Sequence, residues 1–426
     1  MSIKFDAIVV GAGPAGLTTA QQLAQKGFKV LVVERGRKPG SKNVYGGRIY
    51  AHVLDKLYPE YVKEAPVERW VRKERISFLT EDSGTTIEFE TNNVEHKSFT
   101  ASLSDFTEWL GKKAEAAGAM IVTESPVDSL VINDGKVVGI RSGNDEVYGD
   151  VVVSAEGINR LVLERSGLAP KLEPKMVGVG VKEVIKLGRK VINERFNLDE
   201  DEGVAWALAG FPTHYAPGGA FIYTNKDAIT LGLVIYLSHG DKVDTPIHDL
   251  VEEFRLHPFI NRLIKDGQLL EYSGHLTPVM GLNASPPSLY GNGYLVIGDA
   301  AGFLLHGGII IRGVDFAIES GRVAAEAITK VHEGGGNFDE TSLSLYGKLL
   351  EESFVMRELR AFRNAYKALD EPRLYNDYAK FINAFLKRYF DVDGTPRKLF
   401  STFKETKGNV TMLDMMRDMV RMVTNL

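Results

Sequence analysis

The sequence predicts an α/β protein that combines a parallel nucleotide-binding sheet, an inserted antiparallel sheet and a helical C-terminal region. Three observations lead to this fold class. A glycine turn joins a buried strand to a helix within residues 5–26, β-rich segments with polar turns occupy 177–237, and helical patterns dominate from about residue 340. With 426 residues, the chain is also too long for one hydrophobic core.

The first unit is a strand, a helix and a second strand. Residues 5–10 form a continuous apolar run, which is typical of a strand buried on both faces. Residues 17–26 have helical periodicity, Gly27 suits the end of that helix, and residues 28–34 form a second β-branched run. Such a unit is the mononucleotide-binding half of a doubly wound sheet.

The turn inside this unit matches the dinucleotide fingerprint G-x-G-x-x-G at Gly11, Gly13 and Gly16. It follows a strand, opens a helix and precedes Glu34 at the end of the second strand, which is the context that the motif requires. The backbone and the helix N-terminus can hold a pyrophosphate, and Glu34 can accept hydrogen bonds from ribose hydroxyls. The residues expected to contact this half of a dinucleotide are Gly11, Gly13, Pro14, Ala15, Glu34, Arg35 and Gly36.

Later segments add to the same sheet. A helix is expected over 104–117, a strand over 120–123, and a hairpin over 127–142 around Asp134-Gly135. Buried strands at 150–154 and 294–297 each end in a glycine motif, of which Gly298-Asp299 resembles the motif of FAD-dependent hydroxylases and reductases whose Asp meets a ribityl hydroxyl. The further residues expected to contact FAD here are Val127, Ala155, Gly157, Gly298, Asp299 and Gly302.

A second glycine-rich stretch, residues 307–313, precedes a helix expected over 314–330. The N-terminus of that helix would direct partial positive charge at a flavin pyrimidine ring, with Gly308, Ile309 and Ile310 along its edge. His306 precedes the stretch and is the candidate catalytic residue, as a proton relay; the alternative is a histidine that is simply hydrogen bonded in place.

The composition excludes several classes of function. The chain contains no cysteine, so it cannot by itself hold an iron–sulfur cluster or use a thiol nucleophile, and no metal site is expected. The formal charge of −5 and the lack of a basic block argue against nucleic acid as a partner. No signal peptide or membrane span is expected, which predicts a cytoplasmic protein and leaves open a peripheral contact with the inner face of the cell membrane.

Residues 39–47 (PGSKNVYGG), 221–227 (FIYTNKD) and 312–321 (RGVDFAIESG) resemble elements of FixC-type flavoproteins, relatives of electron transfer flavoprotein–quinone oxidoreductase. The resemblance covers roughly residues 1–390. It implies a glutathione-reductase-like FAD-binding (Rossmann) domain, with Lys42, Asn43, Gly46, Gly47 and Arg48 alongside the flavin.

The resemblance also implies an activity and partners. The activity is FAD-dependent electron transfer from reduced electron transfer flavoprotein toward quinone. The partners are the alpha and beta subunits of electron transfer flavoprotein and a small ferredoxin-like iron–sulfur subunit. Some such complexes bifurcate electrons, and the sequence leaves that open. The alternatives are an isoprenoid double-bond reductase of the geranylgeranyl reductase type, an FAD-dependent aromatic hydroxylase, and a binding protein in which FAD is structural.

Three departures from the family pattern concern single contacts. Leu103 stands where the family commonly has Arg, Glu156 replaces the usual Asp, and Asn159-Arg160 replaces a more usual Asn-Ser. The loss of an Arg at position 103 puts one phosphate or flavin contact in doubt. None of the three argues against FAD binding as a whole.

The chain divides into three expected regions. The FAD-binding domain is discontinuous and comprises 1–75, 100–168 and 270–335. The inserted sheet for quinone or substrate comprises 76–99 and 169–269, and the helical C-terminal region is 336–426. This last region contains apolar stripes at helical spacing, and five of the ten methionines lie in 412–422. The favoured interpretation is that the stripes pack against the body of the protein; the alternative is a docking face for a partner subunit or a membrane.

Overall fold

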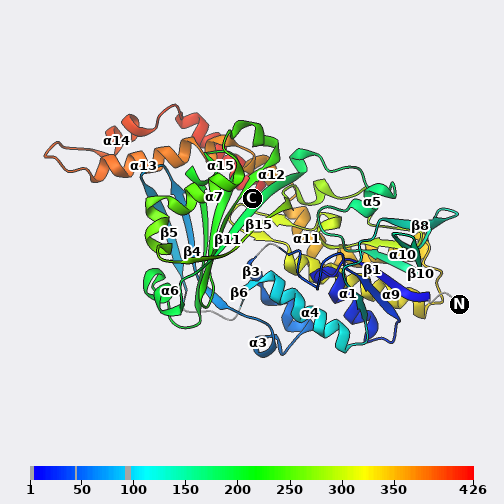
Figure 1. The fold of residues 1–426 in the computed structure, drawn as a ribbon. Coiled ribbons are helices and arrows are strands. Elements are labelled where there is room, and N and C mark those ends of the chain that lie inside the picture. Colours follow the sequence, from blue (N-terminus) through cyan, green and yellow to red (C-terminus); the bar gives the residue numbers. More distant parts are fainter. Residues whose placement is uncertain (1–3, 44–45, 92–96) are drawn as a thin grey trace.

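The computed structural model describes residues 4–43, 46–91 and 97–426. Within these residues the strands form two large sheets and a two-stranded ribbon. Figure 1 shows the first sheet at the N-terminal end of the molecule and the second toward the middle, with helices α13 and α14 projecting at the opposite end.

The first sheet carries the predicted nucleotide-binding topology. Its main path runs in the order β16 (Tyr290–Gly291), β17 (Tyr294–Val296), β10 (Asp145–Ser154), β1 (Lys4–Val10), β2 (Val30–Val33) and β7 (Met120–Val122). From β17 to β7 every pair is parallel, as expected for strands joined by helical crossovers. The predicted hairpin forms β8 (Ser129–Asn133) and β9 (Lys136–Ser142), and β9 pairs antiparallel with β10.

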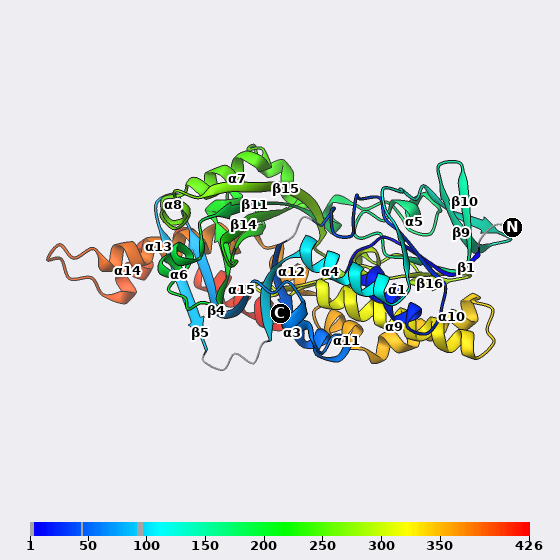
Figure 2. The same ribbon diagram turned by 60° about the horizontal axis from the view of Figure 1, so that its bottom comes forward.

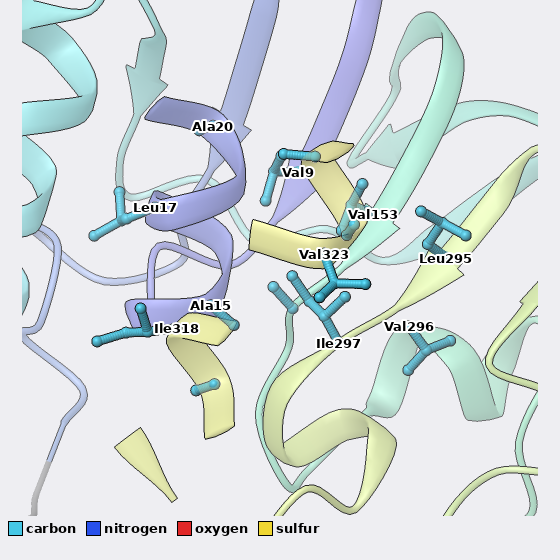
Figure 3. Close-up of a cluster of buried hydrophobic side chains, with 14 of the residues drawn as sticks. Val9, Ala15, Leu17, Ala20, Val153, Leu295, Val296, Ile297, Ile318 and Val323 are labelled. Atoms are coloured by element: carbon cyan, nitrogen blue, oxygen red, sulfur yellow. The ribbon is translucent and has the colours of Figure 1, made fainter. Parts of the chain in front are cut away.

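Helices α1 (Pro14–Ala24), α4 (Leu103–Ala116) and α9 (Val314–Glu333) accompany this sheet. The first begins three residues earlier than the periodicity predicted, because the fixed φ of Pro14 suits the first turn of a helix. Helices α1 and α9 cross closely: a Cβ atom on Gly321 would lie 2.3 Å from the Ala15 carbonyl oxygen, so only glycine fits there. Figure 3 shows the surrounding core, in which Val323 of α9 lies near Val153 of β10, and Leu17 and Ile318 extend from the outer sides of their helices.

The second sheet takes up most of the middle of the chain. Its main path runs β15 (Gln268–Pro278), β11 (Val177–Lys186), β14 (Ala228–Tyr236), β13 (Gly218–Thr224), β12 (Glu202–Gly210), β4 (Arg69–Leu79), β6 (Ser98–Ser102) and β3 (Gly46–Tyr50), and β5 (Gly84–Glu90) pairs with β4. All its strand pairs are antiparallel except β12 with β4, which are parallel. The residue pattern within either strand does not predict this parallel pairing. Its own core is lined by apolar residues of these strands and of α6 (Arg189–Phe196), α7 (Ile247–Leu256) and α8 (Pro258–Ile264).

Several elements belong to a different sheet or core from the one that the predicted three-region division gave them. Strands β3 and β15 belong to the second sheet although most of their residues were assigned to the FAD-binding region. Helices α10 (Glu340–Glu352) and α11 (Phe354–Ala361) contribute buried residues to the core of the first sheet, although they follow residue 336. The three-region division therefore stays a prediction. The remaining short elements are α2 (Leu54–Leu57), α3 (Tyr61–Glu64), α5 (Leu161–Arg165) and α12 (Ala365–Leu369).

The C-terminal helices α13 (Asp377–Phe390), α14 (Leu399–Thr406) and α15 (Met412–Asn425) follow the predicted helical pattern. Asn383 of α13 donates to the Phe78 carbonyl of β4, so α13 packs on the second sheet, and Figure 2 shows α14 extending away from the sheets. For α15, however, the packing interpretation is wrong. Six of its apolar residues are 60–78% exposed: Met412, Leu413, Met416, Met419, Val420 and Val423. The buried side is polar instead, because the carboxylate of Asp418, 3% exposed, is held by Arg373 at 2.8 Å and by the Tyr378 hydroxyl at 2.8 Å.

Candidate functional site

The ends of three neighbouring parallel strands meet at one edge of the first sheet. Val10 of β1 is in register with Ser154 of β10, which is in register with Val296 of β17. The glycine turn after β1, the 155–157 motif after β10 and the 298–302 motif after β17 therefore converge. This is where open α/β sheets bind their ligands.

The glycine turn has the shape of a dinucleotide cradle. Gly11 has a φ of +107°, and a Cβ atom there would lie 2.4 Å from the Ala155 carbonyl oxygen. A Cβ atom on Gly13 would meet nothing within 4 Å. Pro14 and Ala15 open α1 directly behind this space, so the free N–H groups of the first helical turn and their positive dipole face it. The arrangement suits a pyrophosphate.

Glu34 stands beside the cradle. Its carboxylate accepts hydrogen bonds from the backbone N–H groups of Ala12 at 2.9 Å and Gly36 at 2.6 Å. These bonds fix the carboxylate at the end of β2, where the ribose of a dinucleotide lies. The backbone around Glu34 pairs with residues 122–125, and the partly buried Val127 follows that segment.

A cavity of about 470 Å³ continues from this loop to strands β11 and β15 of the second sheet. Two of its side chains, those of Arg35 and Lys42, carry positive charge, so it is suited to a phosphate-bearing ligand, whereas burial lowers the pKa of His275. Its lining comprises Arg35, Ser41, Lys42, Asn159, Val179, Gly274, His275 and Leu276. Of these, the sequence had singled out Arg35 and Lys42 as contacts. His275 was missed because it lies on another sheet and no local motif marks it.

The remaining residues of the 42–48 loop have protein partners. Asn43 donates from Nδ2 to the Thr107 hydroxyl at 2.7 Å, and Arg48 pairs with Glu74 at 2.6 Å and stacks on the Tyr50 ring. Gly46 and Gly47 lie in β3, paired with β6. Val44 and Tyr45, which belong to the same motif, lie outside the described residues.

Asp299 is the acidic residue at the point where the strands converge. It follows Gly298, whose φ is +61°, and precedes Gly302, whose φ is +79°. No hydrogen bond or ion pair to its carboxylate is found among residues 4–43, 46–91 and 97–426. Burial raises the pKa of Asp299 to about 6. Asp299 is half-buried, and a ribityl hydroxyl is a donor from which its carboxylate can accept a hydrogen bond.

Glu156 has a structural role that its motif did not reveal. Its carboxylate accepts hydrogen bonds from the backbone N–H groups of Val162 and Leu163 and from the Ser154 hydroxyl. Burial raises its pKa. Glu156 therefore caps α5, while Gly157, with a φ of +71° and open space around it, is free to face a ligand.

The loop before α9 forms a ribbon between β18 (Leu305–His306) and β19 (Ile311–Arg312). Gly308 has a φ of +81°, and Ile309 and Ile310 are 61% and 44% exposed. His306 Nε2 lies 2.9 Å from the Tyr236 hydroxyl, whereas its Nδ1 is buried without a hydrogen-bond partner among the described residues. Tyr236 lies 70 residues away in the chain, so no sequence signal identified it.

A buried ion-pair network holds the start of α9. Arg312 donates to the carboxylate of Asp315 from Nε at 2.9 Å, and it also pairs with Glu358. Asp315 is 1% exposed and also contacts His52 at 3.0 Å. The Arg-Gly-x-Asp element thus positions the N-terminus of the helix that follows the glycine-rich loop.

These residues fit FAD. The space at Gly13, the Glu34 carboxylate and the unpartnered Asp299 would meet the pyrophosphate, a ribose and the ribityl chain respectively. When bound, the flavin would supply the redox chemistry. Among the described residues no cluster of His, Asp or Glu could hold a metal ion.

Comparison with known proteins agrees with this geometry. Residues 6–95 match the family model of FAD dependent oxidoreductases, 177–276 that of "ETF-QO, ubiquinone-binding", and 366–426 that of the "ETF-QO/FixC family C-terminal domain". Protein FixC of Salmonella typhi is 38% identical over 99% of both chains. This chain belongs to the FixC/ETF-QO family. The probable electron transfer flavoprotein-quinone oxidoreductase YdiS of Escherichia coli is 42% identical over 93% of this chain and 92% of its own length.

The family assignment makes the chain an FAD-dependent oxidoreductase of the electron transfer flavoprotein–quinone oxidoreductase type. A geranylgeranyl bacteriochlorophyll reductase-like protein of Thermoplasma acidophilum shares the fold, with a TM-score of 0.73 over 99% of this chain and 100% of its own. The halogenase PltM, solved in complex with FAD, has a TM-score of 0.65 over 95% of this chain and 86% of its own. At 20% and 14% identity these likenesses show the fold alone.

Proposed function

We propose that this protein accepts electrons from reduced electron transfer flavoprotein on its FAD and passes them to a quinone. The supporting observation is the combination of a dinucleotide site at the strand ends with a second sheet, over 177–276, that matches the ubiquinone-binding model. The cavity beside Arg35 and Lys42 lies between the first and the second sheet. A flavin at the edge of the first sheet would therefore be close to an acceptor bound on the second sheet.

The protein works, in this proposal, as the FixC-like subunit of a larger complex. Its partners are the alpha and beta subunits of electron transfer flavoprotein and a small ferredoxin-like iron–sulfur subunit. The absence of cysteine from these 426 residues supports the last of these, since none of them offers a thiolate to hold a cluster. Whether the complex bifurcates electrons is decided by measuring whether ferredoxin and quinone are reduced together from one donor.

The flavin contacts predicted from the sequence belong to the proposal. Gly11, Gly13, Pro14 and Ala15 hold the pyrophosphate and Asp299 the ribityl chain. His306 is the residue that exchanges protons with the bound quinone. Further contacts are Glu34, Arg35, Gly36, Lys42, Asn43, Gly46, Gly47, Arg48, Val127, Ala155, Gly157, Gly298, Gly302, Gly308, Ile309 and Ile310.

Peripheral membrane contact is part of the same proposal. None of the helices in the described part of the chain combines the length and apolar character needed to cross a bilayer. Helix α15 instead presents its exposed Met, Leu and Val residues along one outer face, with Arg417 and Arg421 also on the surface. Arg417 and Arg421 are paired with Asp414 and Glu371, so the apolar side chains supply the contact. An exposed apolar helix face suits the surface of a bilayer that holds a lipid-soluble quinone.

The test is anaerobic reduction of the purified holoprotein, followed at the flavin absorbance. NAD(P)H alone, reduced electron transfer flavoprotein and then a soluble quinone analogue are added in turn. Rapid bleaching by the flavoprotein only, reversed by quinone, supports the proposal. Rapid bleaching by NAD(P)H alone, without a response to quinone, overturns it in favour of an isoprenoid reductase or a hydroxylase.

A further inference from the structure

A row of three polar aromatic side chains, His306, Tyr236 and Tyr375, leads from the 307–313 loop into the protein; we call it the file. The Tyr236 hydroxyl lies 2.9 Å from His306 Nε2, and the two rings meet edge to face with centroids 5.9 Å apart. Burial raises the pKa of Tyr236, and the neighbouring hydroxyl of Tyr375 raises it further, so the two hydroxyl groups interact. Both tyrosines are buried, with exposures of 5% and 6%. Three segments distant in sequence thus bring one imidazole and two phenol hydroxyls together.

The far end of the file approaches solvent. The Tyr375 hydroxyl donates to the Leu369 carbonyl at 2.7 Å, and the next residue, Asp370, pairs with His239 Nε2 at 2.6 Å. Lys242 Nζ lies 3.3 Å from the other nitrogen of His239. The Asp370 side chain is 49% exposed, so water reaches it. No direct hydrogen bond joins Asp370 to Tyr375 among the described residues, so water must carry a proton across that step.

The near end of the file carries a buried nitrogen atom that has no hydrogen-bond partner within the described part of the chain, His306 Nδ1. Buried polar atoms in folded proteins almost always have a hydrogen-bond partner, and His306 Nδ1 is an exception among the described residues. Burial lowers the pKa of His306 to about 4 and raises that of Tyr236 well above its usual value, so both are neutral at pH 7. A neutral imidazole passes a proton on by accepting at one nitrogen while it releases from the other.

We propose that Tyr236 and Tyr375 are proton-relay residues that supply His306, with the Asp370–His239 pair as the entry from solvent. This inference rests on the proposed function, because it requires an acceptor that consumes protons. A quinone that receives two electrons from the reduced flavin takes up two protons to become the hydroquinone.

Each transfer balances within the file. An O–H bond forms at a quinone oxygen as the N–H bond at Nδ1 of His306 breaks, and Nε2 gains the hydroxyl proton of Tyr236. Tyr236 regains a proton from Tyr375, and Tyr375 regains one from water at Asp370. Since each hydroxyl can donate and accept, rotation of the hydroxyls and the imidazole restores the starting state.

The experiment separates proton delivery from electron transfer. The holoprotein is reduced anaerobically, and its reoxidation is followed by stopped flow with a soluble quinone analogue or with ferricenium, a one-electron oxidant that takes up no proton. Wild type is compared with Tyr236→Phe and Tyr375→Phe, which keep the rings and lose the hydroxyls. Tyr148→Phe is the matched control, because its hydroxyl contacts the exposed Glu146 on the hairpin of the first sheet.

Loss of the relay is expected to slow reoxidation by quinone about tenfold or more in both relay variants, within the range of general acid catalysis, and to change its solvent deuterium isotope effect. Reoxidation by ferricenium and the flavin potential stay at the wild-type values, as does every property of Tyr148→Phe. Equal rates for Tyr236→Phe and wild type with quinone overturn the inference, and so does equal slowing with both oxidants, which indicates a structural role. A wild-type protein that does not reduce quinone at all refutes the proposed function instead.

Discussion

The replacement Asp299→Asn is expected to act in opposite directions on stability and on FAD binding. Burial raises the pKa of Asp299 from its ordinary 3.8 to about 6 without a compensating partner. Each pKa unit corresponds to about 1.4 kcal/mol, so at pH 7 the ionised carboxylate destabilises the FAD-free fold by at most about 3 kcal/mol. Asparagine carries no charge, so the apoprotein gains up to that amount.

The gain depends on pH in a defined way. Below about pH 4 the carboxyl group is protonated in both the folded and the unfolded chain, so wild type and variant are equally stable. Between about pH 4 and pH 6 only the unfolded chain is ionised, so the stability of wild type falls as the pH rises. Above about pH 6 the difference is complete. Urea unfolding of both apoproteins at pH 4, 5, 6 and 7 measures it.

FAD binding is expected to weaken in the same variant. A hydrogen bond to a carboxylate is about twice as strong as one to a neutral acceptor, a difference of about 1 kcal/mol, or roughly fivefold in Kd. Titration of the apoprotein with FAD, followed by quenching of flavin fluorescence, measures this change. Asp145→Asn, at the exposed start of β10, is the control. A variant whose apoprotein is no more stable at pH 7, and which binds FAD as wild type does, would show that Asp299 does not face the ribityl chain.

Three further predictions follow from packing and charge. Gly321→Ala places a Cβ atom 2.3 Å from the Ala15 carbonyl oxygen, so α1 and α9 must separate. We expect the free energy of unfolding to fall by about 1–3 kcal/mol, measured by urea unfolding, and FAD binding to weaken, measured by titration. Arg312→Met leaves the buried Asp315 without its principal cation. We expect the free energy of unfolding to fall by about 3–5 kcal/mol, and urea unfolding measures this loss. Met416→Asp is expected to abolish sedimentation with vesicles containing anionic lipid while the unfolding transition stays in place, because Met416 is 63% exposed.

Two of these predictions have a control within the chain. A Cβ atom on Gly240 would meet only a leucine methyl group at 3.9 Å, so Gly240→Ala should be close to neutral. Phe89→Asp adds the same charge as Met416→Asp at an apolar residue of similar exposure on β5, and vesicle binding should survive it. Unchanged stability in Arg312→Met would contradict the charge network at α9. Loss of vesicle binding in both aspartate variants would indicate a general effect of charge instead of a membrane face on α15.

Sequence alone was sufficient for the nucleotide-binding half of the molecule. The strands 5–10 and 28–34, the glycine turn between them and Glu34 lie within one short unit, so each pattern reports the backbone that its own residues adopt. The Gly298-Asp299 turn was predicted for the same reason. The family followed from motifs of this local kind, and the comparisons confirm it.

The tertiary structure decided what depends on distant partners. Periodicity predicted an apolar helical stripe from Met412 to Val423. In the structure Asp418 faces inward, held by Arg373, and the apolar stripe faces solvent. The pairing of His306 with Tyr236, and the parallel pairing of β12 with β4, likewise join segments far apart in the chain. Local sequence determines which secondary structure forms, whereas the hydrogen bonds and charges of other segments determine which face it presents, and that information is spread over the whole chain.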